Sequence, residues 1–98
     1  MTPRRLTATE VSDLAQTLPM WQVVDEQLLH EIQAPTYMIA INWVVAIAGA
    51  AESLDHHPDI DIRWRTLRIA LITHSTGCLT ELDLDLARLI DTVLSTRA

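Results

Sequence analysis

The apolar positions near the two ends of the chain repeat at the spacing of an α-helix. The first segment follows Thr7-Ala8-Thr9-Glu10, which has the form of a capping box, and Pro19 ends it. The last segment begins near Thr80, with Asp83 placed to act as its capping partner. The repeating apolar residues are Val11, Leu14 and Leu18 in the first segment and Leu82, Leu86, Leu89, Ile90 and Val93 in the last. We therefore expect a short helix at the start of the chain and a longer one at its end.

A long apolar run lies in the middle of the chain. Pro35 suits the first turn of a helix that continues to about Leu54 and is apolar on nearly every side. A helix without a polar face must be covered on more than one side. We expect the sheet to cover one side and another copy of the chain to cover the other. The run from Tyr37 to Ala51 is too short for a good membrane span, which needs ~20 residues.

One pair of strands is expected before this helix in the sequence, and another pair after it. Residues 21–24 and 28–33 have the pattern of two strands joined around Asp25-Glu26. Residues 59–64 alternate between polar and apolar positions, and a further strand over residues 66–73 follows at once. Each pair is predicted to form a hairpin.

The second hairpin has a self-consistent register. A turn centred on residues 64–65 produces three cross-strand pairs: Ile62 with Leu67, Ile60 with Ile69, and Asp61 with Arg68. Apolar residues then share one face, and opposite charges meet on the other. The resulting order over one domain of residues 1–98 is α-β-β-α-β-β-α. It predicts an α+β fold, in which a four-stranded antiparallel sheet has three helices packed on one face.

The charge balance narrows the function classes. The chain has a formal net charge of −6 and its 7 cations are all arginines, so no nucleic-acid partner is expected. Arg63, Arg65 and Arg68 could together bind an anion, but they lie among acidic residues, with which we expect them to pair. The single cysteine, Cys78, excludes an intrachain disulfide and a zinc ribbon. No signal-peptide core follows the first arginines, so we expect a cytoplasmic protein with no membrane partner.

Three of the four histidines lie around the second hairpin. His56 and His57 precede its first strand, and His74 follows its second. In the register above, position 56 lies opposite position 73, which brings His74 within one strand spacing, ~5 Å, of the pair. Imidazole titrates near ~6.5, so this cluster can supply a proton donor and a proton acceptor at neutral pH. Adjacent side chains of an extended segment point to opposite faces, so His56 and His57 cannot easily share a metal ion.

The spacing of these residues resembles the signature of the pterin-4a-carbinolamine dehydratases. Glu52 stands just before His56-His57-Pro58, and Trp64, His74 and Asp83 follow at the intervals of that family. The flanking segments that also match are Ala51-Glu52-Ser53-Leu54-Asp55, Thr73-His74 and Gly77-Cys78-Leu79-Thr80. The departures from the family pattern are at Ala34, Tyr37, Ser75 and Cys78, and none removes an expected proton-transfer group.

The resemblance implies a hydro-lyase of tetrahydropterin recycling. Members of the family remove water from the 4a-hydroxytetrahydropterin that aromatic amino acid hydroxylases release, and they produce the quinonoid dihydropterin. They need no metal and no organic cofactor, and they form homodimers or homotetramers. The resemblance also implies that His56 and His74 are the acid–base pair, with His57, Glu52 and Asp83 supporting them. The implied substrate-binding residues are His57, Trp64, Asp55, Thr73 and Ser75.

Other interpretations of these residues and of the whole chain stay open. Asp83 could serve only as a helix cap, Glu52 could be a solvated carboxylate at a helix end, and Trp64 could only pack the hairpin. His30 lies outside the motif and is expected to be structural. The second functional hypothesis is a non-catalytic protein that binds or assembles other proteins. Relatives of that kind tend to lose parts of the histidine motif, which this sequence keeps, so the enzyme is favoured.

Overall fold

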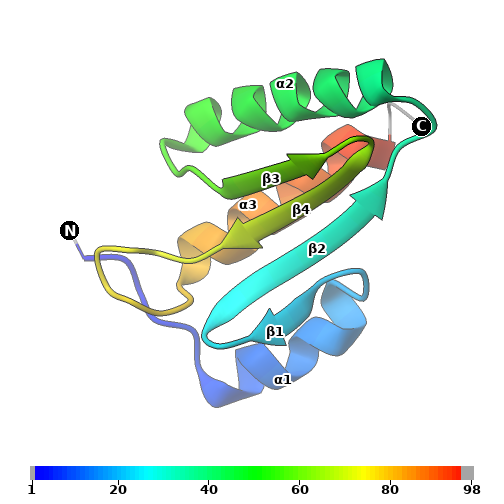
Figure 1. The fold of residues 1–98 in the computed structure, drawn as a ribbon. Coiled ribbons are helices and arrows are strands. Elements are labelled where there is room, and N and C mark those ends of the chain that lie inside the picture. The colour runs from blue at the N-terminus through cyan, green and yellow to red at the C-terminus, as the bar shows by residue number, and fades with distance from the viewer. Residues whose placement is uncertain (1, 96–98) are drawn as a thin grey trace.

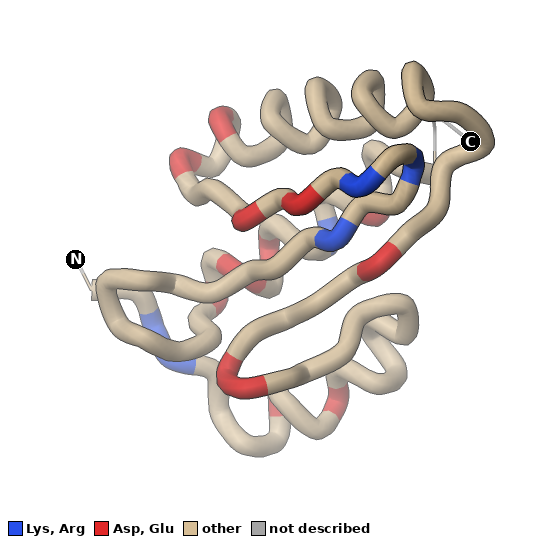
Figure 2. Tube along the Cα trace, in the orientation of Figure 1, with Lys and Arg blue, Asp and Glu red and all other residues tan. Residues whose placement is uncertain are grey.

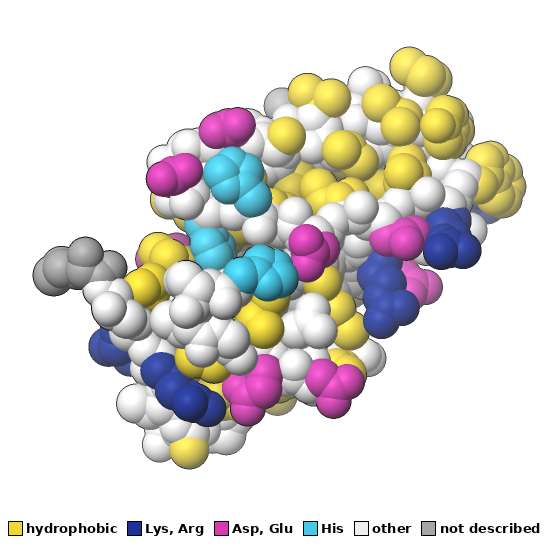
Figure 3. All heavy atoms as spheres, turned by 60° about the vertical axis from the view of Figure 1, so that its left-hand side comes forward, with side chains coloured by type: hydrophobic (Ala, Val, Ile, Leu, Met, Phe, Trp, Pro, Cys, Tyr) yellow, Lys and Arg dark blue, Asp and Glu magenta, His cyan; other side chains and the backbone are white. Residues whose placement is uncertain are grey.

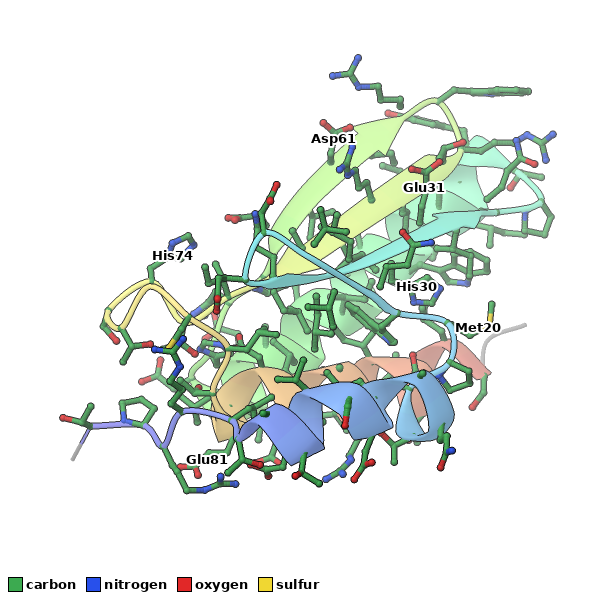
Figure 4. All side chains as sticks on the ribbon, turned by 90° about the horizontal axis from the view of Figure 1, so that it is seen from below. Met20, His30, Glu31, Asp61, His74 and Glu81 are labelled. Carbon is green, nitrogen blue, oxygen red and sulfur yellow. The ribbon has the colours of Figure 1, made fainter. Side chains whose placement is uncertain are left out.

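The fold consists of two layers, a sheet and a set of helices (Figure 1). The computed structural model describes residues 2–95. The strands of the antiparallel sheet lie in the order β1-β2-β4-β3, and the helices cover one of its faces (Figures 1 and 4). In chain order the elements are α1 (Ala8–Thr17), β1 (Gln22–Val24), β2 (Gln27–Gln33), α2 (Tyr37–Leu54), β3 (Asp59–Arg63), β4 (Thr66–Leu71) and α3 (Glu81–Ser95). The predicted fold class and element order are confirmed.

The helix starts are set by threonine caps. At α1 the predicted capping box is present: the Thr7 hydroxyl accepts from the Glu10 N–H at 3.1 Å, and the Glu10 carboxylate accepts from the Thr7 N–H at 2.9 Å. At α2 the prediction was wrong by two residues, because Thr36 is the cap and accepts from the Ile39 N–H at 3.1 Å. Pro35 therefore lies before the helix rather than in its first turn.

Both hairpins form with two-residue turns. The predicted register of β3 on β4 is confirmed, including all three cross-strand pairs. In the first hairpin Asp25 and Glu26 both have left-handed backbone angles, with φ of 50° and 65°, which match the twist of the flanking strands. The strand predicted to reach Thr73 ends earlier, at Leu71, because the Thr73 backbone pairs with Cys78 instead.

The charged residues of the second hairpin lie close together along β3 and β4 (Figure 2), and on the strands they occupy the exposed positions of the alternating pattern. The predicted pairing with acids holds for Arg63, whose Nε lies 3.1 Å from Asp61 Oδ1, and Arg68 lies opposite Asp61 in the register. It is wrong for Arg65, whose Nη1 donates to the Ala34 carbonyl at 3.0 Å. The Ala34 N–H donates to the Arg65 carbonyl at 2.8 Å, so the two backbones are already joined there.

The core lies between the sheet and the helices, and α2 also packs against α3. Large fully buried apolar side chains come from all parts of it: Leu28, Leu67, Ile69 and Leu71 from the sheet, Ile47 from α2, and Leu86 and Ile90 from α3. The alternating pattern of the strands places these side chains on one sheet face and the charged ones on the other.

Helix α2 is apolar on its outward side as well as toward the core. Tyr37, Met38, Ile41 and Val45 lie on the outward side, and we call them the outer patch; Met38 and Val45 are 64% and 66% exposed. By length and composition α2 could cross a membrane, with a mean hydropathy of 1.5 over 18 residues, although its apolar run from Tyr37 to Ala51 is shorter than a typical span of ~20 residues. A helix that packs on a protein core can have the same length and hydropathy, so these two properties are weak evidence for a span.

A buried histidine lies between the sheet and α3. His30 on β2 is 5% exposed, its ring meets the Trp21 ring edge-on at 5.0 Å, and its Nδ1 lies 3.9 Å from Asp91 Oδ1. Asp91 already accepts the Trp21 indole N–H at 2.8 Å. Neither His30 nitrogen has a hydrogen-bond partner among the described residues. Burial lowers the pKa of His30, and the Asp91 carboxylate opposes that effect only in part.

This arrangement predicts a loss of stability in mild acid. The unfolded chain takes up a proton at His30 near pH ~6.5 and the folded chain does so only at lower pH. The free energy of unfolding should therefore fall as the pH drops below that value. Urea denaturation at pH 7.5 and 5.5 should show a larger loss for the wild type than for His30→Leu. Equal losses in the two proteins would contradict this role for His30.

Candidate active site

Three histidines gather at one end of the molecule, where α2 ends and β4 leaves the sheet (Figure 3). The chain turns at Asp55, which has a left-handed backbone with φ 49° and ψ 43°. The Asp55 N–H donates to the Glu52 carbonyl at 3.2 Å, and the His56 N–H donates to the Ala51 carbonyl at 3.1 Å. This end of α2 therefore fixes the backbone position of His56 and, next to it, of His57.

The third histidine lies on the loop between β4 and α3. The loop closes on itself, since the Thr73 carbonyl accepts from the Thr76 N–H at 3.1 Å and from the Gly77 N–H at 2.8 Å. Gly77 has a φ of 69°, which favours glycine. His74 is exposed on this loop. A hollow of about 330 Å³ lies between the loop and the end of α2, lined by Asp55, His56, His57, Ile72, Thr73, His74, Ser75 and Leu82.

A fully buried carboxylate, Asp83 on α3, joins these segments. Its Oδ1 lies 2.6 Å from His56 Nε2, and its Oδ2 accepts from the Thr73 hydroxyl at 2.8 Å and from the Thr80 N–H at 3.0 Å. The Thr73 proton goes to the carboxylate, so Thr80 donates its own hydroxyl proton to Thr73 Oγ1, 2.6 Å away. The two interpretations of Asp83 are therefore not exclusive, because one carboxylate caps α3 and contacts His56.

Each of the other two motif histidines also faces a carboxylate. His57 Nε2 lies 3.6 Å from Glu52 Oε2, and His74 Nε2 lies 3.5 Å from Asp59 Oδ2. Both pairs are exposed to solvent, in contrast to the largely buried His56. Sequence reasoning missed Asp59. The signal available was its position, directly after His56-His57-Pro58 and at an outward-facing place on β3.

Trp64 does not join this cluster within the chain. It lies in the turn of the second hairpin, with the Arg65 guanidinium 4.6 Å from its ring centre. The five residues of β3, at about 3.3 Å each, separate it from the histidine end. Trp64 does not line this hollow, because the motif spacing counts residues along a strand that leads away from the histidines.

The arrangement is suited to proton transfer. An imidazole can donate and accept protons through its two ring nitrogens, and three imidazoles with neighbouring carboxylates line this small hollow. Asp55, Thr73 and Ser75 line the same hollow, as do His56, His57 and His74. Across residues 2–95, no group of three or more His, Cys, Asp or Glu side chains is arranged to hold a metal ion.

Comparison with known proteins supports the family resemblance that the histidine motif indicates. The family model described as pterin 4 alpha carbinolamine dehydratase matches residues 4–93. The chain belongs to this family. A Nocardia farcinica protein named "putative pterin-4-alpha-carbinolamine dehydratase" is 45% identical over 91 residues, which are 93% of this chain and 96% of that protein. A Mycobacterium tuberculosis protein of the same name is 44% identical over 86 residues, 88% of this chain and 92% of that one.

Two solved structures resemble the fold. A Brucella melitensis protein described as a transcriptional coactivator/pterin dehydratase has a TM-score of 0.85 and 32% identity over 92% of this chain and 98% of that one. A pterin dehydratase-like protein identified as a RuBisCO assembly factor in the alpha-carboxysome has a TM-score of 0.60 and 20% identity, over 74% of this chain and 84% of that one. The second likeness concerns the fold alone.

The buried contacts of Asp83 predict a cost to stability when its charge is removed. In Asp83→Asn one amide oxygen must replace two carboxylate oxygens, so at least one of the donors from His56, Thr73 or Thr80 loses its acceptor. The free energy of unfolding should fall by about 1–3 kcal/mol, measured by urea denaturation. Asp85→Asn, at an exposed position of the same helix, is the matched control and should change it by about 0.5 kcal/mol or less. Equal losses in Asp83→Asn and Asp85→Asn would contradict the stabilising role assigned to the Asp83 contacts.

Proposed function

We propose that the chain is a pterin-4a-carbinolamine dehydratase, which removes water from 4a-hydroxytetrahydropterin and leaves the quinonoid dihydropterin. The observation that carries this proposal is the His56–Asp83 contact of 2.6 Å at the edge of a hollow that also exposes His57 and His74. Family membership over residues 4–93 supports it. The reaction breaks the C–O bond at carbon 4a, and the oxygen leaves as water once a proton has been added.

The geometry supports a division of roles between the histidines. A carboxylate only accepts hydrogen bonds, so the His56 Nε2 that faces Asp83 carries a proton, and Nδ1 is the nitrogen left to accept one. In this proposal His56 is the general base that takes the proton lost from the pterin ring. His74 on the facing loop then donates a proton to the departing hydroxyl. His57, held near Glu52, contacts the pterin.

The proposal extends to cofactors, pathway and compartment. Both steps are proton transfers, so we propose that no metal and no organic cofactor takes part and that the pterin is the substrate. In this proposal the enzyme takes part in the recycling of tetrahydropterin after aromatic amino acid hydroxylation, and it does so in the cytoplasm. The alternative is a non-catalytic assembly factor, the role named for a protein that shares this fold. The retained histidines and the hollow beside them favour the enzyme.

The acid–base assignment predicts the effect of removing each histidine. His56→Ala and His74→Ala should each lower kcat by about 100-fold or more, because each removes one proton-transfer group. Dehydration of chemically generated 4a-hydroxytetrahydropterin, followed by ultraviolet absorbance, measures this. Gln16→Ala, at an exposed position of α1, is the control. A folded wild type no faster than buffer would reject the enzyme and favour the assembly factor.

We also propose that the chain self-associates through α2, as a homodimer or homotetramer. Met38 and Val45 of the outer patch are among the most exposed apolar side chains described. A contiguous apolar surface of this kind is unfavourable in water and is typical of protein interfaces. Figure 3 shows apolar side chains gathered over α2, away from the histidines.

Self-association predicts that one added charge on the outer patch separates the copies. Val45→Asp should sediment as a monomer at micromolar concentration, where the wild type sediments as an oligomer, because the interface would have to bury an unpaired carboxylate. Met20→Asp is the matched control, since Met20 and Val45 are both 66% exposed and Met20 lies outside α2. A wild type that sediments as a stable monomer would rule the association out.

A further inference from the structure

We propose that Asp59 is a positioning residue for His74, an inference that rests on the proposed dehydratase function. The observation is the 3.5 Å separation between Asp59 Oδ2 and His74 Nε2. The acidic side chain paired with this ring is Asp59, which lies outside the motif. Asp59 therefore completes a pattern in which each histidine at the hollow has its own carboxylate, after Asp83 for His56 and Glu52 for His57.

The backbone holds Asp59 where it can reach the loop. Asp59 is the first residue of β3 and pairs with Ala70 of β4, so its position is fixed by the sheet. The next residue, Ile60, packs against the core, and alternation turns the Asp59 carboxylate to the opposite face. Figure 4 labels His74 and Asp61, and it shows His74 on the loop beyond the end of the sheet.

The loop that carries His74 is held by contacts of the preceding residue, Thr73, and not by contacts of the His74 ring. Thr73 is buried, with its hydroxyl bonded to Asp83 and its carbonyl closing the turn to Gly77. The His74 side chain is 69% exposed, so its ring can rotate unless another group restrains it. Asp59 is the carboxylate within reach of Nε2. Acceptance of the Nε2 proton by Asp59 would leave Nδ1 as the nitrogen directed to the pterin.

The contact should become stronger when the substrate binds. Both side chains are exposed in the free protein, where the pair contributes little to stability but still biases the tautomer of the His74 ring. A pterin that covers the hollow excludes water, and the attraction between the carboxylate and the imidazole then rises as the surrounding dielectric constant falls. Catalytic contacts that are long in the free enzyme commonly shorten in the complex. Asp59 therefore acts mainly after binding, on kcat rather than on KM.

Asp61 provides a matched control on the same strand. It lies two residues further along β3, on the same outer face and also exposed, and it carries the same charge. Its Oδ1 contacts Arg63 Nε at 3.1 Å, and its neighbour across the sheet is Arg68. Removal of this charge changes the outer sheet face without changing the surroundings of His74.

The test compares Asp59→Asn, Asp59→Glu and Asp61→Asn for dehydration kinetics. Asp59→Asn should lower kcat by about tenfold with little change in KM, because the pterin still binds while the His74 ring is misoriented. Asp59→Glu keeps the carboxylate and should recover most of the rate. Asp61→Asn should match the wild type. Wild-type kinetics in Asp59→Asn, or equal losses in the two asparagine variants, would overturn the proposal.

Histidine ¹⁵N spectra separate this proposal from the proposed function. The ring nitrogens of His74 should show a changed tautomer balance in Asp59→Asn, while those of His56 stay as in the wild type, and Asp61→Asn should change neither. This result does not require turnover, so it tests the contact even if the wild type proves inactive. An active wild type in which Asp59→Asn slows the reaction but leaves the His74 signals unchanged would overturn the positioning role.

Discussion

The buried carboxylate of Asp83 is the contact on which this end of the molecule depends. An ionised carboxylate without partners is costly to bury, and Asp83 is fully buried. Its oxygens contact a ring nitrogen from His56, a hydroxyl from Thr73 and a backbone N–H from Thr80. These groups come from the segment after α2, the segment after β4 and the start of α3. Satisfying one charge therefore brings together the three segments from which the hollow is built.

The same contact separates the histidines into two kinds. His56 is largely buried and held by a fixed partner, so its ring has one orientation before any substrate arrives. His57 and His74 are exposed, and their carboxylates lie at 3.6 Å and 3.5 Å across a surface open to water. A rigid group and adjustable groups around one hollow allow a flat ring to enter and then be oriented. Proton transfer needs that orientation more than it needs tight binding.

The sequence predicted those features that depend on local patterns. Capping at Thr7, the register of Ile60 on Ile69 and the meeting of His56 with His74 at one end followed from spacing alone. The features it missed depend on where an element points in space. Trp64 matches the motif along the chain, but β3 carries it away from the hollow. Asp59 belongs to no expected pair, because its contact with His74 arises only when β4 ends before the loop turns back.

Catalysis and protein binding need not compete in this fold, because α2 divides them along its length. The helix presents the outer patch from Tyr37 to Val45, whereas Glu52 at its other end contacts His57. From Val45 to Glu52 is seven residues, and at about 1.5 Å per residue that is roughly 10 Å along the helix axis. A second copy or another protein can therefore cover the patch while the hollow stays open. The left-handed turn at Asp55 follows the helix end, so a partner that displaced α2 would also move His56. In the proposed enzyme, such a partner would alter catalysis through the position of this histidine, without touching the pterin.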